Sequence, residues 1–128
     1  MEKSEKLAGV WLDHHEAHII SNHDGQEVNS LQIKGHVKSH EHGRYGSEFK
    51  AHNSKTNDLH KFFNEIMGHL TNTQELYLLG TGTAQEELTH YLANIPQWKK
   101  LKVTDEPTGK MTAEMVLNKV SDHFSKNL

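Results

Sequence analysis

The sequence contains no cysteine, and this absence excludes disulfide frameworks, thiolate zinc sites and cysteine nucleophiles together. Its apolar runs fall well short of the roughly 18 residues that a membrane helix needs, so we expect no transmembrane span and no membrane partner. The first residues, Met-Glu-Lys-Ser-Glu-Lys, are charged and lack the apolar core of a signal peptide. These absences together predict a cytoplasmic protein.

Hydrophobic residues are also scarce, at 34% of 128 positions, but they recur in periodic clusters. Such periodicity is typical of a folded domain rather than of a disordered chain. The length suits one domain with one core. We therefore predict a single domain over residues 1–128 with its core between residues 7 and 124.

Arginine occurs once, at Arg44, and the net charge is −3, which argues against a general nucleic-acid binder. The charge is unevenly distributed, however. Residues 34–55 hold five lysine or arginine residues against two glutamates, whereas residues 1–33 and 56–128 are each net negative. The same segment holds four of the 12 histidines, so its positive charge grows as pH falls through the histidine range.

Alternating apolar residues predict two strands over residues 7–13 and 16–21, joined by a tight hairpin, with Trp11 facing away from its apolar neighbours. A third strand is predicted over residues 26–33, with a break in its alternation that suits a bulge. Residues 34–55 contain few apolar side chains and are predicted to form a long loop, the kind that is usually functional or disordered.

The rest of the chain predicts a helix, a strand, a helix, a strand and a helix in turn. The first helix has an apolar stripe from Leu59 to Leu70, and Asn57 is a suitable N-cap. Residues 76–79 are apolar without alternation, as in a strand that is buried on both faces. The other elements are a helix from a capping box at Thr83 to about Asn94, an edge strand over 101–104 and a helix over 112–124.

The predicted order, β-β-β-α-β-α-β-α, indicates an α/β protein with a ribonuclease H-like fold. Three strands joined by tight turns form an antiparallel meander, and two βα units extend it in parallel to a mixed five-stranded sheet with helices packed on it. The edge strand over 101–104 has an open side, so an interaction module that forms a homodimer through this strand is one hypothesis for the protein.

The histidine clusters are candidate metal ligands. His40 and His42 point the same way on an extended segment, but they lack a third ligand, so we predict no metal and no cofactor and keep this pair as the weak candidate. Residues 14–18 are one residue short of the zinc-binding His-Glu-x-x-His pattern and lie on a hairpin. A two-metal nuclease needs several carboxylates, and Asp13 is a single acid at a strand end.

The turn that contains Gly80, Gly82 and Thr83 lies between the buried strand and a helix N-terminus. Backbone N–H groups and the helix dipole at such a place can bind an anion. The alternative is that the glycines allow a tight turn and close packing of the helix on the sheet. A nucleotide-binding fingerprint is excluded because the third glycine and a P-loop lysine are missing.

Segment 34–55 combines cations, glycines and an aromatic side chain, the elements of phosphate contact and base stacking. The candidate RNA-binding residues are Lys34, Lys38, Arg44 and Lys50, with Tyr45 as a stacking partner, and the arginine suits bidentate phosphate contact best. The alternative is a basic loop that is merely solvated.

Three segments carry a family resemblance: Val-Trp-Leu-Asp-His-His-Glu-Ala at 10–17, Leu-Leu-Gly-Thr-Gly-Thr-Ala-Gln-Glu-Glu-Leu at 78–88, and Thr-Asp-Glu-Pro-Thr-Gly at 104–109. In order and spacing they resemble the opening hairpin, the strand–Gly-x-Gly–helix segment and the late loop of the middle domain of archaeal and eukaryotic class-1 release factors and Pelota. The chain looks most similar to bacterial relatives of this superfamily, among them small proteins named for the translational machinery or for host attachment.

In release factors of this superfamily, the loop between the third strand and the first helix carries Gly-Gly-Gln, which promotes peptidyl-tRNA hydrolysis on the ribosome. The corresponding position here is Gly-Ser-Glu at 46–48. The resemblance therefore implies a protein that binds the ribosome or a tRNA through its basic loop and is not a hydrolase. The alternative is a peptidyl-tRNA or RNA hydrolase that uses His40, His42 or Glu48, since a neutral imidazole serves as a general base near pH 7.

Overall fold

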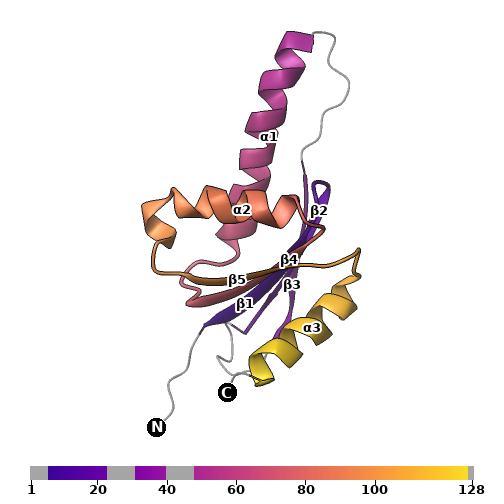
Figure 1. The fold of residues 1–128 in the computed structure, drawn as a ribbon, viewed down its shortest axis with the longest axis vertical. Coiled ribbons are helices and arrows are strands. Elements are labelled where there is room, and N and C mark those ends of the chain that lie inside the picture. Colours follow the sequence, from indigo (N-terminus) through magenta and orange to yellow (C-terminus); the bar gives the residue numbers. More distant parts are fainter. Residues whose placement is uncertain (1–5, 23–30, 40–47, 127–128) are drawn as a thin grey trace.

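The computed structural model describes residues 6–22, 31–39 and 48–126, with the backbone alone for residues 48–57 and 126. Helices cover both faces of one sheet (Figure 1). The elements in chain order are β1 (Leu7–Leu12), β2 (Glu16–Ser21), β3 (Gln32–Lys38), α1 (Glu48–Gly68), β4 (Glu75–Gly80), α2 (Ala84–Ala93), the 3-10 helix η2 (Pro96–Trp98), β5 (Lys102–Pro107) and α3 (Ala113–Lys126). This order confirms the predicted α/β arrangement.

The five strands lie in the order β3-β2-β1-β4-β5. Strand β2 pairs antiparallel with both β1 and β3, while β4 pairs parallel with both β1 and β5. The predicted mixed sheet, a meander of three strands extended by two parallel strands, is confirmed. Strand β5 lies at one edge, as expected for residues 101–104, and a homodimer through this edge stays a prediction.

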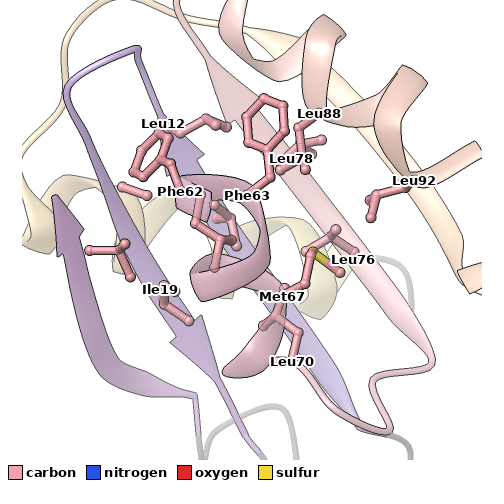
Figure 2. Close-up of a cluster of buried hydrophobic side chains, with 14 of the residues drawn as sticks. Leu12, Ile19, Phe62, Phe63, Met67, Leu70, Leu76, Leu78, Leu88 and Leu92 are labelled. Carbon is pink, nitrogen blue, oxygen red and sulfur yellow. The ribbon is translucent and has the colours of Figure 1, made fainter. Parts of the chain in front are cut away.

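Side chains of the central strands alternate between two cores, one on each face of the sheet. Val10 and Leu12 contribute to the core under α1 and α2, whereas Trp11 points to the opposite face, where Val120 of α3 packs. Figure 2 shows the first core, in which side chains of α1 lie over β1, β2 and β4. Its labelled members are Leu12, Ile19, Phe62, Phe63, Met67, Leu70, Leu76, Leu78, Leu88 and Leu92.

Gly9 allows α3 to pack closely on the sheet. A Cβ atom at this position would lie only 2.7 Å from Cγ1 of Val120, which is far inside van der Waals contact. The residue in the middle of β1 therefore has to lack a side chain for the second core to close.

Two boundaries predicted from the sequence are wrong. The third strand, Gln32–Lys38, extends past the predicted end at residue 33, and residues 26–30 of the predicted strand lie outside the described residues. The first helix begins at Glu48 rather than after Asn57. Most of segment 34–55, predicted as a loop, is thus strand or helix. Strand β3 is an edge strand in which Val37 is buried and most other residues are not, so its apolar signal is weak.

The early turns of α1 extend past the end of the sheet (Figure 1). They have no strand to cover, so the apolar stripe that marks the helix in the sequence begins only at Leu59. Among the helices of the described residues, none has the length and apolar character required to cross a bilayer.

Candidate functional site

A row of aromatic rings crosses three strands on the sheet face that carries α3. Trp11 of β1 is paired in register with His18 of β2, which is paired with His36 of β3. The ring centroids of Trp11 and His18 are 5.9 Å apart, and those of His18 and His36 are 4.9 Å apart, with the rings stacked. Glu16 lies two residues before His18 and therefore on the same face of the sheet. We call Glu16, His18 and His36 the histidine–glutamate cluster.

Glu16 is the centre of the polar contacts in the cluster. Its Oε1 atom lies 2.7 Å from Nε2 of His36, and its Oε2 atom accepts a 2.6 Å hydrogen bond from Nζ of Lys110. The same ammonium group donates to Oδ2 of Asp13 at 3.1 Å. Both carboxylates are largely covered, with 24% and 14% of their side chains exposed. One lysine thus holds two carboxylates that belong to the β1–β2 hairpin.

Lys110 reaches the cluster because the loop between β5 and α3 is attached to Trp11. The indole Nε1 of this buried tryptophan donates to Oγ1 of Thr108 at 2.9 Å and to the carbonyl of Gly109 at 3.2 Å. Nζ of Lys110 lies 5.1 Å from the centroid of the same indole, within cation–π range. Trp11 therefore anchors this loop through its hydrogen bonds and also contacts Lys110 through its ring.

These contacts set the charge states of the cluster. Hydrogen bonds from Lys110 and then from His36 lower the pKa of Glu16 from 4.5 to about 2. Burial by itself raises the pKa of Asp13, but backbone N–H groups and Lys110 outweigh it and lower the pKa overall. Burial lowers the pKa of His18, which favours its neutral form. At neutral pH the site thus combines two carboxylates, one ammonium group and an uncharged imidazole.

The cluster is also the set of residues able to hold a metal ion within the described ranges. The ligand atoms of Glu16, His18 and His36 all lie within 4.8 Å of one another. Sequence spacing places the first two on one strand face, but the third joins them through the pairing of β2 with β3. Because a loop was predicted after residue 33, the pairing of His18 with His36 could not be predicted; it requires the correct register of β2 and β3.

The predicted RNA-binding residues have been placed in part. Lys34 and Lys38 lie in the edge strand β3, and Lys50 lies in the first turn of α1, where only the backbone is described. Arg44 and Tyr45 lie outside the described residues. The candidate interface therefore has one flank on β3 and the other on α1.

The predicted catalytic and metal candidates in the same segment are not described. His40 and His42 lie outside the described residues, and Glu48 is the first residue of α1, with its backbone alone described. Neither the hydrolase alternative nor the His40–His42 metal pair gains support from a described contact.

The turn after β4 is shaped by Gln85. The side-chain Oε1 atom of this buried residue accepts a 2.8 Å hydrogen bond from the N–H of Gly82, whose φ is +116°. Thr83 is the N-cap but makes no side-chain capping bond, so the predicted capping box is wrong, and Gln85 instead pairs with the N–H of Gly82 just before the helix. A Cβ atom on Gly80 would lie 2.6 Å from the carbonyl oxygen of Leu12. These contacts fit the tight-turn alternative, and anion binding at Gly80, Gly82 and Thr83 stays a prediction.

An open pocket of about 420 Å³ lies elsewhere, before the start of β4. Its lining includes Asn72, Gln74, Gln97, Trp98 and Lys100, together with neighbouring residues. None of the described residues that line it is a histidine or a carboxylate. This pocket therefore lacks the acid–base and metal-binding groups that gather in the histidine–glutamate cluster.

Comparison with known proteins gives a match by structure and none by sequence. No protein-family model and no curated protein matches the chain. Among solved structures, the Pelota protein of Thermoplasma acidophilum is 22% identical with a TM-score of 0.50, over 88% of this chain and 31% of that one. The archaeal translation termination factor aRF1 is 13% identical with a TM-score of 0.57, over 93% of this chain and 34% of that one.

Pelota from Archaeoglobus fulgidus gives a similar result, with 11% identity and a TM-score of 0.56 over 98% of this chain and 36% of that one. The chain thus spans about a third of the length of each of these proteins. At such identities the likeness concerns the fold. The chain has the fold of one domain-sized part of Pelota and aRF1 proteins, as its resemblance to their middle domain predicted.

Proposed function

We propose that the protein acts in translation in the cytoplasm, by binding RNA of the ribosome or a tRNA, and that it does not hydrolyse peptidyl-tRNA. The observation that carries this proposal is the fold, which it shares with part of Pelota and of an archaeal translation termination factor. The family resemblance in the sequence, at 10–17, 78–88 and 104–109, supports the same conclusion.

The proposed RNA contact is the basic segment 34–55, which includes most of β3 and the early turns of α1. Lys34 and Lys38 belong to β3, which is an edge strand and thus open to a partner on one side. Figure 1 shows that the early turns of α1 project beyond the sheet, so this end of the helix is also peripheral. Cations on peripheral elements reach phosphate groups without a rearrangement of the core, and such contacts are salt-sensitive.

The absence of hydrolysis is inferred from the residues at 46–48. In release factors the equivalent segment is Gly-Gly-Gln, whereas this chain has Gly-Ser-Glu. An ionised glutamate only accepts hydrogen bonds, so it does not replace the donor function of a glutamine amide. Its negative charge is also repelled by RNA. Binding without turnover is therefore the expected activity.

Co-sedimentation of the purified protein with ribosomes at low and high salt tests the proposal. We expect the wild-type protein to pellet with ribosomes at low salt and to be released at high salt. A triple variant with Lys38, Arg44 and Lys50 changed to alanine should stay in the supernatant under both conditions. Wild-type protein that remains in the supernatant at low salt would contradict the proposal.

A matched control separates a specific contact from a general loss of positive charge. It changes three exposed lysines near the opposite edge of the sheet to alanine. These lysines are Lys99, Lys100 and Lys102. The control carries the same change in net charge, so it should pellet like the wild type if segment 34–55 is the interface. An equal loss in both triple variants would show that binding follows net charge alone.

A further inference from the structure

We propose that the histidine–glutamate cluster, Glu16, His18 and His36, is a binding site for a divalent transition-metal ion such as Zn²⁺. This inference is independent of the proposed role in translation. It rests on the positions of three donor side chains, on the contact of the Glu16 carboxylate with Lys110 and on the access of solvent to the cluster.

The sheet fixes the three donor groups relative to one another. His18 and His36 are directly paired across β2 and β3, and Glu16 lies two residues before His18 on the same strand face. Backbone hydrogen bonds of the sheet therefore determine the separation of the side chains. Their ligand atoms already lie within 4.8 Å of one another. A site on paired strands is more rigid than one on a loop.

The donor set suits a transition metal. Two imidazoles and one carboxylate form the three-ligand set found in open zinc sites, where the fourth position is left to water or substrate. The same set also suits other first-row metals, since imidazole ligands favour zinc, copper, iron and nickel over calcium or magnesium. Glu16 and His36 have side chains that are 24% and 42% exposed, so solvent reaches the open position.

The two carboxylate oxygens of Glu16 have different partners. Oε2 is held by Lys110 at 2.6 Å, which leaves Oε1 directed at Nε2 of His36, at 2.7 Å. Ligands of a tetrahedral zinc ion lie about 3.3 Å apart, so the ion requires a separation wider by roughly half an ångström. Lys110 is then the outer partner that orients the carboxylate, as such partners do in metal sites. Asp13, on the same lysine, offsets part of the added positive charge.

Titration of the tag-free protein with Zn²⁺, followed by calorimetry, tests the site. We expect one ion per chain, and an affinity that falls at least about 100-fold in His36→Ala and His18→Ala, because each removes a ligand from a three-ligand site. Glu16→Gln should weaken binding about 10- to 100-fold. His36 is the most exposed of the three, so its variant is expected to keep the fold, which circular dichroism checks.

Two matched controls use histidines elsewhere in the chain. A double variant, with His40 and His42 changed to alanine, removes a second pair of histidines that are close in the sequence. His90→Ala removes an exposed histidine of α2. Both should bind Zn²⁺ like the wild type. Absence of binding by the wild-type protein, unchanged affinity in a folded His36→Ala variant, or loss of binding in the His40–His42 double variant would overturn the proposal.

Tryptophan fluorescence gives a second readout that depends on position. Trp11 stacks on His18, with 5.9 Å between the ring centroids, so a bound paramagnetic Co²⁺ ion should quench its emission. The measurement uses Trp98→Phe protein, in which Trp11 is the remaining tryptophan. Quenching that saturates at one equivalent of Co²⁺ and disappears in the added His36→Ala variant supports the site. If calorimetry shows that one equivalent of Co²⁺ binds but the emission of Trp11 is not quenched, the ion binds elsewhere in the chain.

Discussion

The anchor of the loop between β5 and α3 can be tested with Trp11→Phe. The indole side chain is fully buried in the core under α3 and donates hydrogen bonds to Thr108 and Gly109. Phenylalanine keeps a ring in this core but removes the donor and part of the volume. We expect a less stable protein whose loop is no longer held against the sheet.

The size of the effect follows from two contributions. Loss of the indole donor costs about 1 kcal/mol, the usual net value of one hydrogen bond. Replacing the bicyclic ring in a fully buried position leaves a small cavity that costs about 1–2 kcal/mol, less than the full truncation to alanine. The free energy of unfolding should therefore fall by about 2–3 kcal/mol. For a domain of this size, the corresponding drop in Tm is about 10 °C.

Urea unfolding followed by circular dichroism measures the stability, and limited trypsin digestion measures the loop. Trypsin cleaves after lysine, so a released loop exposes the bond that follows Lys110, and cleavage there should accelerate in Trp11→Phe. Trp98→Phe is the matched control, because Trp98 is only partly buried and packs against the core on the opposite face of the sheet from Trp11. A Trp11→Phe protein that matches this control in stability and in cleavage at Lys110 would refute the anchoring role.

Two further predictions concern the core and the pH dependence of stability. Gly9→Ala should cost about 1–3 kcal/mol in urea unfolding because the added methyl group overlaps Val120, and adding Val120→Ala should recover part of that loss. Glu106→Gln should lower stability by less than about 1 kcal/mol at neutral pH, since the carboxylate is 46% exposed. Hydrogen bonds from Tyr77 and then Lys119 lower the pKa of Glu106 below its usual 4.5, so the wild-type advantage should be complete above pH 4.5 and vanish as pH falls through the lowered value.

The element order could be predicted because most elements carry a local signal. The alternation in β1 and β2, the unbroken apolar run of β4 and the stripe of α3 each follow from the face that the element buries. The boundaries of strand β3 and the start of α1 were predicted wrongly for one reason, namely that both lie at the margin of the sheet. An edge strand and a projecting helix end bury little apolar surface. Their sequences therefore do not need the regular spacing of apolar residues from which a strand or helix is predicted.

The candidate site could be predicted less well, because its residues are distant in the sequence. Glu16 and His18 belong to a segment that is one residue short of a zinc-binding pattern, but a site there also requires His36, which comes from another strand. Lys110 joins them through the fold alone, since it is 94 positions after Glu16 in the sequence. Cross-strand sites of this kind depend on the register, and the register of β2 and β3 contains an irregularity at Ile19 and Ile20 that periodicity does not locate.

The proposed metal site and the proposed RNA contact both include residues of β3, so binding of the ion should affect binding of RNA. Lys38 is the register partner of Glu16, so its side chain lies on the same face as the proposed metal site. Directly paired residues have Cβ atoms about 5 Å apart, so a Zn²⁺ ion bound at Glu16 adds positive charge within roughly one Debye length, about 8 Å, of this lysine. RNA that contacts the flank of β3 should therefore be held more tightly when the ion is present.

For partly screened surface charges, a gain of about 0.5–1 kcal/mol is expected, which is roughly two- to five-fold in affinity at low salt. Ribosome co-sedimentation in Mg²⁺ buffer, with and without an equivalent of Zn²⁺, measures this gain. In His36→Ala the zinc-free affinity should match that of the wild type, because the imidazole is not one of the phosphate contacts, while the zinc effect should be absent. An equal zinc effect in the wild type and in His36→Ala would show that the ion acts on the ribosome or at another part of the chain, and the coupling through β3 would be wrong.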